Sequence, residues 1–534
     1  MAFPAGQRGA ALLILFAIIS LGVAFALVAG LNRSAATLTL ERGQKTTTAL
    51  AQAKEALIAY AVTYKDKYDN PGGGTYTVPG YLPCPDLGPG TNVEGVAAAP
   101  CGASLVSVMG KLPWKTLGLG PLRDGSGECL WYAVSGTYKN NPNGVSGSTT
   151  TSNMMNWDTN GQFAVRDSDG ASFLTGSTAD TNAVAVIFAP GSALSGQNRT
   201  TPAGWLSPSN QVPVCGGNYT ATAYLETANG INNSVVSGTA NAQNPFIAGT
   251  GSSTFNDQLV YITRADIWNA IRKRSDFNNN LRSLTRLAAE CTAMYGNNNN
   301  ISYPNDMRLP WAANVSLSTT SVPIYAVNAR YNDTSGIRSG RLPFKVETSV
   351  GNTSNKLSTS IADYGTNSAY IFTNSSYCSY TADQKIWYDN WKDQLFYATA
   401  DNYDPSSPDS PMATCASANC LKINGAGYYA AVVIFAGDKL ANATGQVTQP
   451  RSLATEKGTI ANYLEGSSPT SITANTGSGN YQAAATSSSF NDIVYAIDTT
   501  LAVKCYSASS STMVPVPAAT AAPPGDPAAY GACP

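Results

Sequence analysis

Histidine is absent from all 534 residues of this chain, and the spacing Cys-x-x-Cys is absent as well. Without histidine, the Ser-His-Asp and Cys-His arrangements of nucleophilic catalysis are excluded, and a zinc site with the usual Cys/His spacing is not expected. Charge is also scarce, since 12% of the residues are charged and the net charge is −1. The composition therefore gives no reason to expect nucleic acid or an anionic membrane surface as a partner.

Cysteine, by contrast, is well represented. The chain has ten, which agrees with an oxidising compartment outside the cytoplasm, and its length leaves room for two or three domains. Proximity suggests disulfides between Cys84 and Cys101 and between Cys415 and Cys420, and Cys129 could pair with Cys215. Sequence alone does not connect the other four, which are Cys291, Cys378, Cys505 and Cys533.

The longest apolar run lies near the start of the chain. Residues 10–31 carry no charge, and as a helix they would span about 33 Å, enough to cross the hydrocarbon core of a membrane. Helical periodicity then continues through residues 46–68, where Leu50, Leu57 and Tyr64 recur on one face. Pro71 and the glycines after it end this pattern.

This order resembles the type IV prepilins and pseudopilins of bacterial pili and type II secretion. The resemblance implies that a prepilin peptidase cuts after Gly9 and leaves Ala10 as the mature N-terminus. It also implies a single-pass inner-membrane location before assembly, with the globular part in the periplasm or outside the cell on a pilus. The implied partners are other minor pilins or pseudopilins and the assembly platform.

The chain departs from the family at mature position five, where Glu is usual and Ile14 stands here. In the family that Glu is thought to pair with the N-terminal amine of a neighbouring subunit, which offsets the cost of a charge in apolar surroundings. A subunit at the tip has no neighbour above it, so the departure favours a tip or minor component. Two other interpretations of the segment stay open, an ordinary signal peptide and a plain single-span anchor.

Landmarks in the region after the first helix return later in the same order, which indicates a tandem duplication. The matched segments are 111–114 with 308–311, 124–133 with 389–398, 184–189 with 432–436, 224–226 with 463–465, and 253–261 with 489–495. A helix expected over 281–295 would open the second copy, as 46–68 opens the first.

The expected fold class is α+β, with a pilin-type helix followed by two copies of a helix packed on a mostly antiparallel sheet. The expected parts are a leader at 1–9, the membrane helix and its extension at 10–45, a first repeat at 46–263, a helical connector at 264–277, a second repeat at 278–505, and a Pro/Ala/Ser-rich tail at 506–534. Its composition predicts that the tail is disordered.

Two segments, 124–132 and 389–397, resemble the Asp-x-Trp-Gly-x-x-aromatic-Tyr stretch of pseudopilin globular domains. The first has Ser126 where Trp is usual and keeps Gly127, whereas the second keeps Trp391 and has Lys392 where Gly is usual. We expect each segment to be a turn into a sheet strand whose aromatic side chains face the helix.

Calcium is the one cofactor for which the sequence offers candidate ligands. Asp86, Asn92 and Glu94 supply hard oxygens within one loop, although Leu87 and Pro89 stand where further oxygens would be needed. Similar incomplete fragments begin at Asp158 and Asp167, and such clusters are usually Asx turns. We therefore expect no cofactor, with calcium as the alternative.

The function that these observations favour is a non-enzymatic minor subunit at the tip of a type IV pilus or pseudopilus, which primes assembly or presents a binding surface. An envelope-anchored binding protein unrelated to filaments is the first alternative. A carbohydrate-active enzyme with a carboxylate pair is the second, but no such pair stands out among the 33 Asp and Glu residues.

Overall fold

The structure, a computed structural model, covers the chain with gaps. It describes residues 7–70, 76–88, 93–139, 154–201, 214–298, 307–344, 346, 381–406, 415–416, 418–442, 447–517 and 533. For residues 7–36 and 298 it describes the backbone only.

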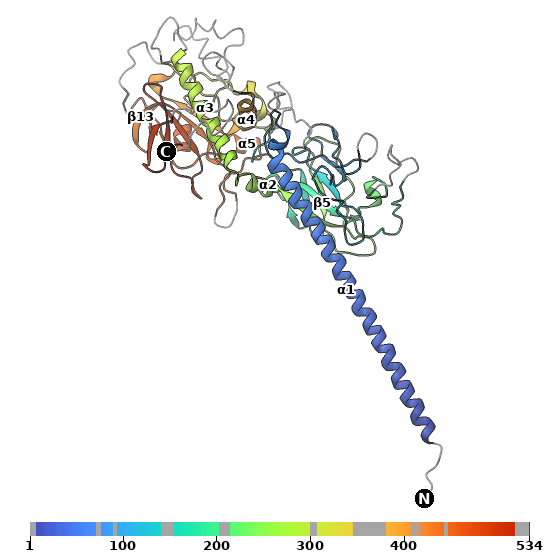
Figure 1. Ribbon diagram of the computed structural model, residues 1–534. Coiled ribbons are helices and arrows are strands. Elements are labelled where there is room, and N and C mark those ends of the chain that lie inside the picture. Colours follow the sequence, from blue (N-terminus) through green and yellow to red (C-terminus); the bar gives the residue numbers. More distant parts are fainter. Residues whose placement is uncertain are drawn as a thin grey trace.

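Helix α1 (Gln7–Tyr68) is a single helix of 62 residues, about 93 Å long at 1.5 Å per residue. Figure 1 shows its C-terminal part against the body of the protein and its N-terminal part extending away as a rod. The part within the body buries Leu50, Leu57 and Ala61 at helical spacing, as the sequence predicts. Lys65 and Lys67 lie in the last turn, where cations interact favourably with the carbonyl end of a helix.

Within the part of the chain whose side chains are described, no helix is both long and apolar enough to cross a membrane. The run 10–31, on which the expectation of a membrane helix depends, lies outside that part. The membrane helix therefore stays a prediction from the sequence.

The first lobe, residues 46–263, is built on a seven-stranded sheet. Its strands are β1 (Val108–Lys111), β2 (Trp131–Val134), β3 (Phe163–Arg166), β4 (Phe173–Thr175), β5 (Ala183–Ala189), β8 (Asn244–Ile247) and β9 (Gln258–Thr263), and a separate ribbon pairs β6 (Thr227–Ala228) with β7 (Ile231–Asn232). Strand β5 is central and antiparallel to β2 and β9. All seven of its residues are buried, because α1 covers one face and aromatic side chains such as Trp131 and Phe246 cover the other.

The second lobe, residues 275–517, is built on an eight-stranded sheet. Its strands are β10 (Ser339–Arg341), β11 (Leu395–Thr399), β12 (Leu421–Ile423), β13 (Ala426–Phe435), β14 (Asn480–Tyr481), β15 (Ile493–Asp498), β16 (Val503–Ser507) and β17 (Thr512–Pro515). The helices after α1 are α2 (Arg264–Ile271), α3 (Ser275–Asn298), α4 (Ala382–Trp391), α5 (Ala454–Lys457) and α6 (Ser468–Ala474). The fold class is thus α+β, as expected from the sequence.

The two lobes share their central strand order. The order β1-β2-β5-β9 in the first sheet corresponds to β10-β11-β13-β15 in the second. Helix α1 packs against β5 and β9, and α3 packs against β13 and β15. In Figure 1 the two helices run along their own lobes, with α2 between them. Each lobe also holds a parallel pair of strands, β3 with β8 in the first and β12 with β14 in the second.

Individual hydrogen bonds also correspond. The Tyr132 hydroxyl donates to the carbonyl of Pro83 at 3.2 Å, and the Tyr397 hydroxyl donates to the carbonyl of Pro310 at 3.0 Å. The backbone amide of Leu82 donates to Tyr138 O at 2.7 Å. The corresponding bond in the second lobe joins Leu309 N to Tyr403 O at 2.6 Å.

These bonds give a different pairing for one of the matched landmarks. Lys111 exchanges backbone hydrogen bonds with Asp86, and Arg341 exchanges the same bonds with Ala313. The segment in the position of 111–114 is therefore 341–344, whereas 308–311 occupies the position of 81–84. Each lobe contains two Leu-Pro segments, and the sequence comparison matched the two that are followed by Trp, at 114 and 311.

Two further expectations need correction. Residues 506–515 are not disordered, because β17 pairs with β16 and Cys533 is bonded to Cys505. Met513 and Val514 are adjacent and both half-buried, so this edge strand lacks the apolar/polar alternation that predicts a strand, and its Ser/Pro-rich surroundings hid it. In addition, Asp389 is not in a turn like that of Asp124, since it lies near the end of α4.

Candidate functional site

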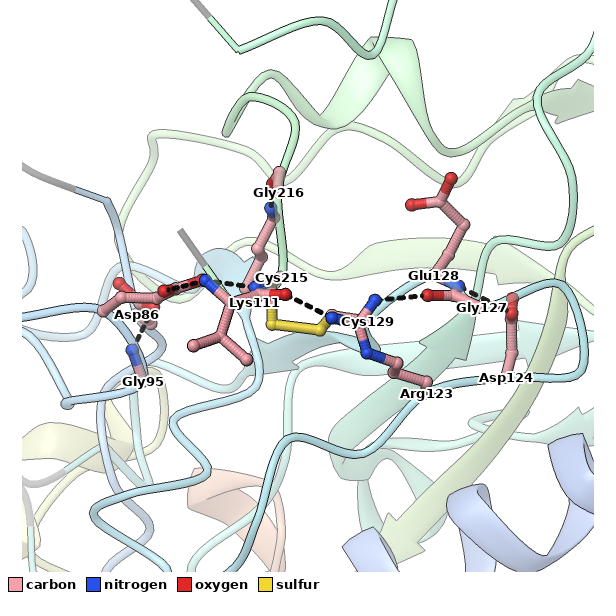
Figure 2. Close-up of a disulfide and its surroundings, with 12 residues drawn as sticks. Asp86, Gly95, Lys111, Arg123, Asp124, Gly127, Glu128, Cys129, Cys215 and Gly216 are labelled. Carbon is pink, nitrogen blue, oxygen red and sulfur yellow. Dashed lines mark hydrogen bonds between the residues drawn. A yellow bond between two sulfur atoms is a disulfide. The ribbon is translucent and has the colours of Figure 1, made fainter. Parts of the chain in front are cut away.

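The loop that carries the candidate calcium ligands is built into the first lobe beside a disulfide (Figure 2). The Asp86 carboxylate accepts hydrogen bonds from the Gly88 amide at 3.0 Å, from the Gly95 amide at 2.7 Å and from the Tyr219 hydroxyl at 2.8 Å. Burial raises the pKa of Asp86, although these hydrogen bonds oppose the shift. The residue closes its own loop in the manner of an Asx turn.

The Glu94 carboxylate binds a different segment of the chain. Its two oxygens accept hydrogen bonds from the Val214 and Cys215 amides, each at 2.7 Å. It therefore positions the segment that carries the Cys129–Cys215 disulfide. Asp86 and Glu94 both direct their oxygens at protein donors, and Asn92 lies outside the described residues.

Lys111 completes this region. Its ammonium donates to Gly216 O at 2.8 Å and lies 4.4 Å from the centre of the Tyr219 ring. Burial lowers the pKa of Lys111 to about 8. Figure 2 shows Lys111 between Asp86 and the disulfide. Among the described residues no group of three or more His, Cys, Asp or Glu could hold a metal ion, so the calcium site has no support there.

The structure joins the three cysteine pairs that the sequence suggested, 84 with 101, 129 with 215, and 415 with 420. It adds the bond between Cys505 and Cys533. Cys291 is also disulfide-bonded, and Cys378 lies outside the described residues. The 505–533 bond was not predicted, because it fastens a tail expected to be disordered.

Two of these disulfides should contribute unequally to the stability of the protein. Cys129 and Cys215 are separated by 86 residues, whereas Cys415 and Cys420 are separated by five. The entropy of the unfolded chain predicts that the free energy of unfolding falls by about 4.5 kcal/mol when the first pair is replaced by alanine, against about 2 kcal/mol for the second. Denaturant unfolding of the two double variants measures the difference, and equal losses would contradict the entropic account.

The second concentration of polar groups lies where the lobes meet, at a loop of the first lobe, residues 154–160. The Met155 amide donates to Asn390 Oδ1 at 2.8 Å. The Asn156 side-chain amide donates to Asn390 O at 2.8 Å and to Asp393 Oδ1 at 3.0 Å. The segment 389–397, selected from the sequence as a family motif, thus binds the loop of the other lobe through its polar residues.

Asp158 lies at the centre of this junction. Its Oδ2 accepts a hydrogen bond from Gln394 at 2.6 Å. Cations from the second lobe surround the carboxylate, with Lys439 and Arg451 at 3.7 Å and Lys457 at 3.8 Å. Burial disfavours the charged form, but Arg451, Lys439 and Lys457 together hold the pKa of Asp158 well below its usual range.

Other charges tie this cluster to both lobes. Lys457 pairs with Asp393 at 2.7 Å, and Lys439 donates to Asp180 of the first lobe. Burial lowers the pKa of Lys439 to about 8. The sequence marked Asp158 only as part of an Asx-turn fragment, because its partners lie more than 230 residues further along the chain.

An aromatic cluster adjoins these charges. The centre of the Trp157 ring lies 4.6 Å from the centre of the Trp391 ring and 5.8 Å from the centre of the Phe435 ring. Both pairs have edge-to-face geometry. The ring of Trp268, in α2, packs against Trp391 with the two ring centres 5.6 Å apart. Edge-to-face pairs of this kind each contribute about 0.5–1.5 kcal/mol beyond their burial. The aromatic residues therefore help to fix the lobes against each other.

A buried carboxyl pair occurs among the described residues of each lobe. Glu226 N donates to Asp257 Oδ2 at 2.9 Å, and Glu465 N donates to Asp492 Oδ2 at 3.0 Å. Burial and then the neighbouring Glu226 carboxylate raise the pKa of Asp257 to about 8. The same two causes, with Glu465 as the neighbour, raise the pKa of Asp492.

The raised pKa values in these pairs predict that the free energy of unfolding falls as pH rises. A carboxyl group whose pKa is raised to about 8 by folding contributes stability that is fully present below about pH 4 and is lost as pH rises through 8. Each proton released on unfolding makes the free energy of unfolding fall by about 1.4 kcal/mol per pH unit. Asn has the shape of the protonated carboxyl but does not titrate. Asp257→Asn should therefore make the free energy of unfolding depend less on pH between pH 5 and 8. Unfolding midpoints across this range test it, and an unchanged slope would contradict the assignment.

Gly9 and Ala10, the residues of the expected peptidase cut, lie near the beginning of α1, where only the backbone is described. In Figure 1 this end of α1 lies away from both lobes. Comparison of the chain with protein-family models, with curated proteins and with solved structures found no match.

Proposed function

We propose that this protein is a non-enzymatic minor subunit of a type IV pilus or type II secretion pseudopilus, placed at the tip. The observation that carries the proposal is α1. One continuous helix of 62 residues has its C-terminal part packed on an antiparallel sheet and its N-terminal part extended away from the lobe. A filament subunit needs this division, because the extended part holds it in the membrane and later in the filament while the lobe is displayed.

The same proposal includes a duplication of the lobe. It is supported by the shared strand order and by matched side-chain contacts. Arg199 donates to Gly191 O at 2.8 Å and to Gln197 Oε1 at 2.7 Å. Arg451 donates to Gly437 O at 2.9 Å and to Gln449 Oε1 at 3.3 Å. A second lobe adds exposed surface beyond the first without adding a second filament helix, which suits a subunit that ends a filament.

The alternatives differ in their support. An envelope-anchored binding protein without a filament is favoured by the cleft between the lobes described below. An enzyme that uses paired carboxylates has less support, because the close pairs Glu226/Asp257 and Glu465/Asp492 are buried and bind backbone amides. Such pairs hold strands in place and are closed to a substrate.

The tip position follows from Ile14. In a filament shaft the N-terminal amine of the next subunit would meet Ile14 among apolar helices, and an unpaired charge there costs several kcal/mol. We therefore expect gold-labelled antibody to mark only the ends of sheared filaments. Ile14→Glu should allow incorporation along the shaft, whereas the control Ile14→Leu should not. Wild-type label along the whole filament would contradict the tip assignment.

A further inference from the structure

The two lobes enclose a cleft of about 440 Å³ on one side of the loop 154–160. The first lobe supplies one wall through residues such as Thr137 and Asn182. The second lobe supplies the other through residues 320–323, 326, 451, 452 and 457. Clefts of about 300–1,000 Å³ are typical of small-molecule sites, which also occur preferentially between domains. We propose that this cleft binds a neutral saccharide.

The lining has the composition that a sugar requires. Half of the twenty lining residues are Asn, Gln, Ser or Thr, whose side chains both donate and accept hydrogen bonds. Met154, Val322 and Pro323 supply an apolar part of the wall. A sugar ring presents hydroxyl groups at its edge and C–H groups on its faces, so it matches both kinds of surface.

One buried acceptor is left for a ligand. Asp158 is 4% exposed and lines the cleft, and its Oδ1 accepts no hydrogen bond from the described residues. The nearest cation, Lys439, lies 3.7 Å from that atom, beyond hydrogen-bond distance. An ionised carboxylate oxygen without a donor is costly when buried, and a ligand hydroxyl would supply the missing bond.

The charges around Asp158 favour a neutral ligand. Arg451 and Lys457 line the same cleft, so the carboxylate is already compensated and a ligand cation would be repelled. Arg451 donates to Asn462 O, Gln394 Oε1 and Gly437 O, and Lys457 is paired with Asp393. An anion would compete with these bonds and face Asp158. The inference concerns the cleft alone and holds for a filament subunit and for an anchored binding protein alike.

Saturation-transfer NMR on the full chain in detergent tests the proposal. The probes are glucose, galactose, mannose, N-acetylglucosamine and N-acetylgalactosamine, with glucuronate and glucosamine as charged counterparts. At least one neutral sugar should show transfer, with weaker transfer from its charged counterpart. Absence of transfer from every neutral sugar, or transfer from the charged probes alone, would overturn the proposal.

Two variants locate the bound sugar. Thr320→Trp places a large side chain at the wall of the cleft and should weaken binding at least tenfold. Thr319 is exposed like Thr320 but does not line the cleft, so Thr319→Trp is the matched control and should bind as wild type. Asp158→Asn should also weaken binding about tenfold, because it replaces a charge-assisted hydrogen bond with a neutral one. Equal affinity in Thr320→Trp and Thr319→Trp would show that any bound sugar lies elsewhere, whether or not Asp158→Asn folds.

Discussion

Replacing Gly9 with valine is expected to leave the protein at its full precursor length. In the prepilin family the peptidase cuts after a glycine, and the residue before the cut must lack a side chain. The variant should therefore stay in the membrane unprocessed, and its processed form should be absent rather than reduced. Electrophoretic mobility in cells with an active prepilin peptidase measures this directly.

The leader provides its own control. Gly6 lies three residues before Gly9 in the same leader, so Gly6→Val changes the same residue type away from the cut and should be processed as wild type. If Gly9→Val is processed normally, the cut after Gly9 is refuted. If both variants stay unprocessed, valine anywhere in the leader blocks the peptidase. The failure of Gly9→Val would then not show that the cut follows Gly9.

Replacing Arg451 with methionine is expected to destabilise the second lobe by about 3–5 kcal/mol. The guanidinium of Arg451 is fully buried and lies 3.7 Å from Asp158. Its removal leaves a buried carboxylate short of one cation and leaves the carbonyl of Gly437 without a donor. Methionine fills most of the volume, so the loss reports the polar contacts rather than a cavity.

Arg199 is the matched control, because it makes corresponding hydrogen bonds in the first lobe. Its ion-pair partner is Glu128, whose side chain is 27% exposed, whereas that of Asp158 is 1% exposed. Arg199→Met should therefore cost less, about 1–2 kcal/mol. Denaturant unfolding compares the two variants, and equal losses would contradict the role assigned to the buried Asp158 cluster.

The sequence predicted the features that depend on local pattern. The buried face of α1 followed from Leu50 and Leu57 at helical spacing. The short disulfide of Cys415 and Cys420 followed from proximity. The central strand β5 followed from its uninterrupted apolar residues, since a strand covered on both faces shows no alternation.

The predictions from the sequence failed for features that depend on residues far apart in the chain. The match of 111–114 with 308–311 used residue identity, whereas the hydrogen-bond register gives Arg341 the kind of backbone pairing in its lobe that Lys111 has in the first. The cluster around Asp158 joins residues separated by more than 230 positions, and no local pattern marks such a group. Strand β17 was missed because pairing with β16 and a disulfide at Cys533 stabilise a segment of loop-like composition.

The N-terminal residue of the mature protein tests the central claim most directly. Mass spectrometry of the N-terminal peptide, from protein made in its own cells, identifies it. The proposed filament subunit predicts Ala10, with a methyl group on its amine. A start near Leu27 or Leu31 would indicate a signal peptide, and an intact Met1 would indicate a plain anchor; either result would contradict the pilin assignment.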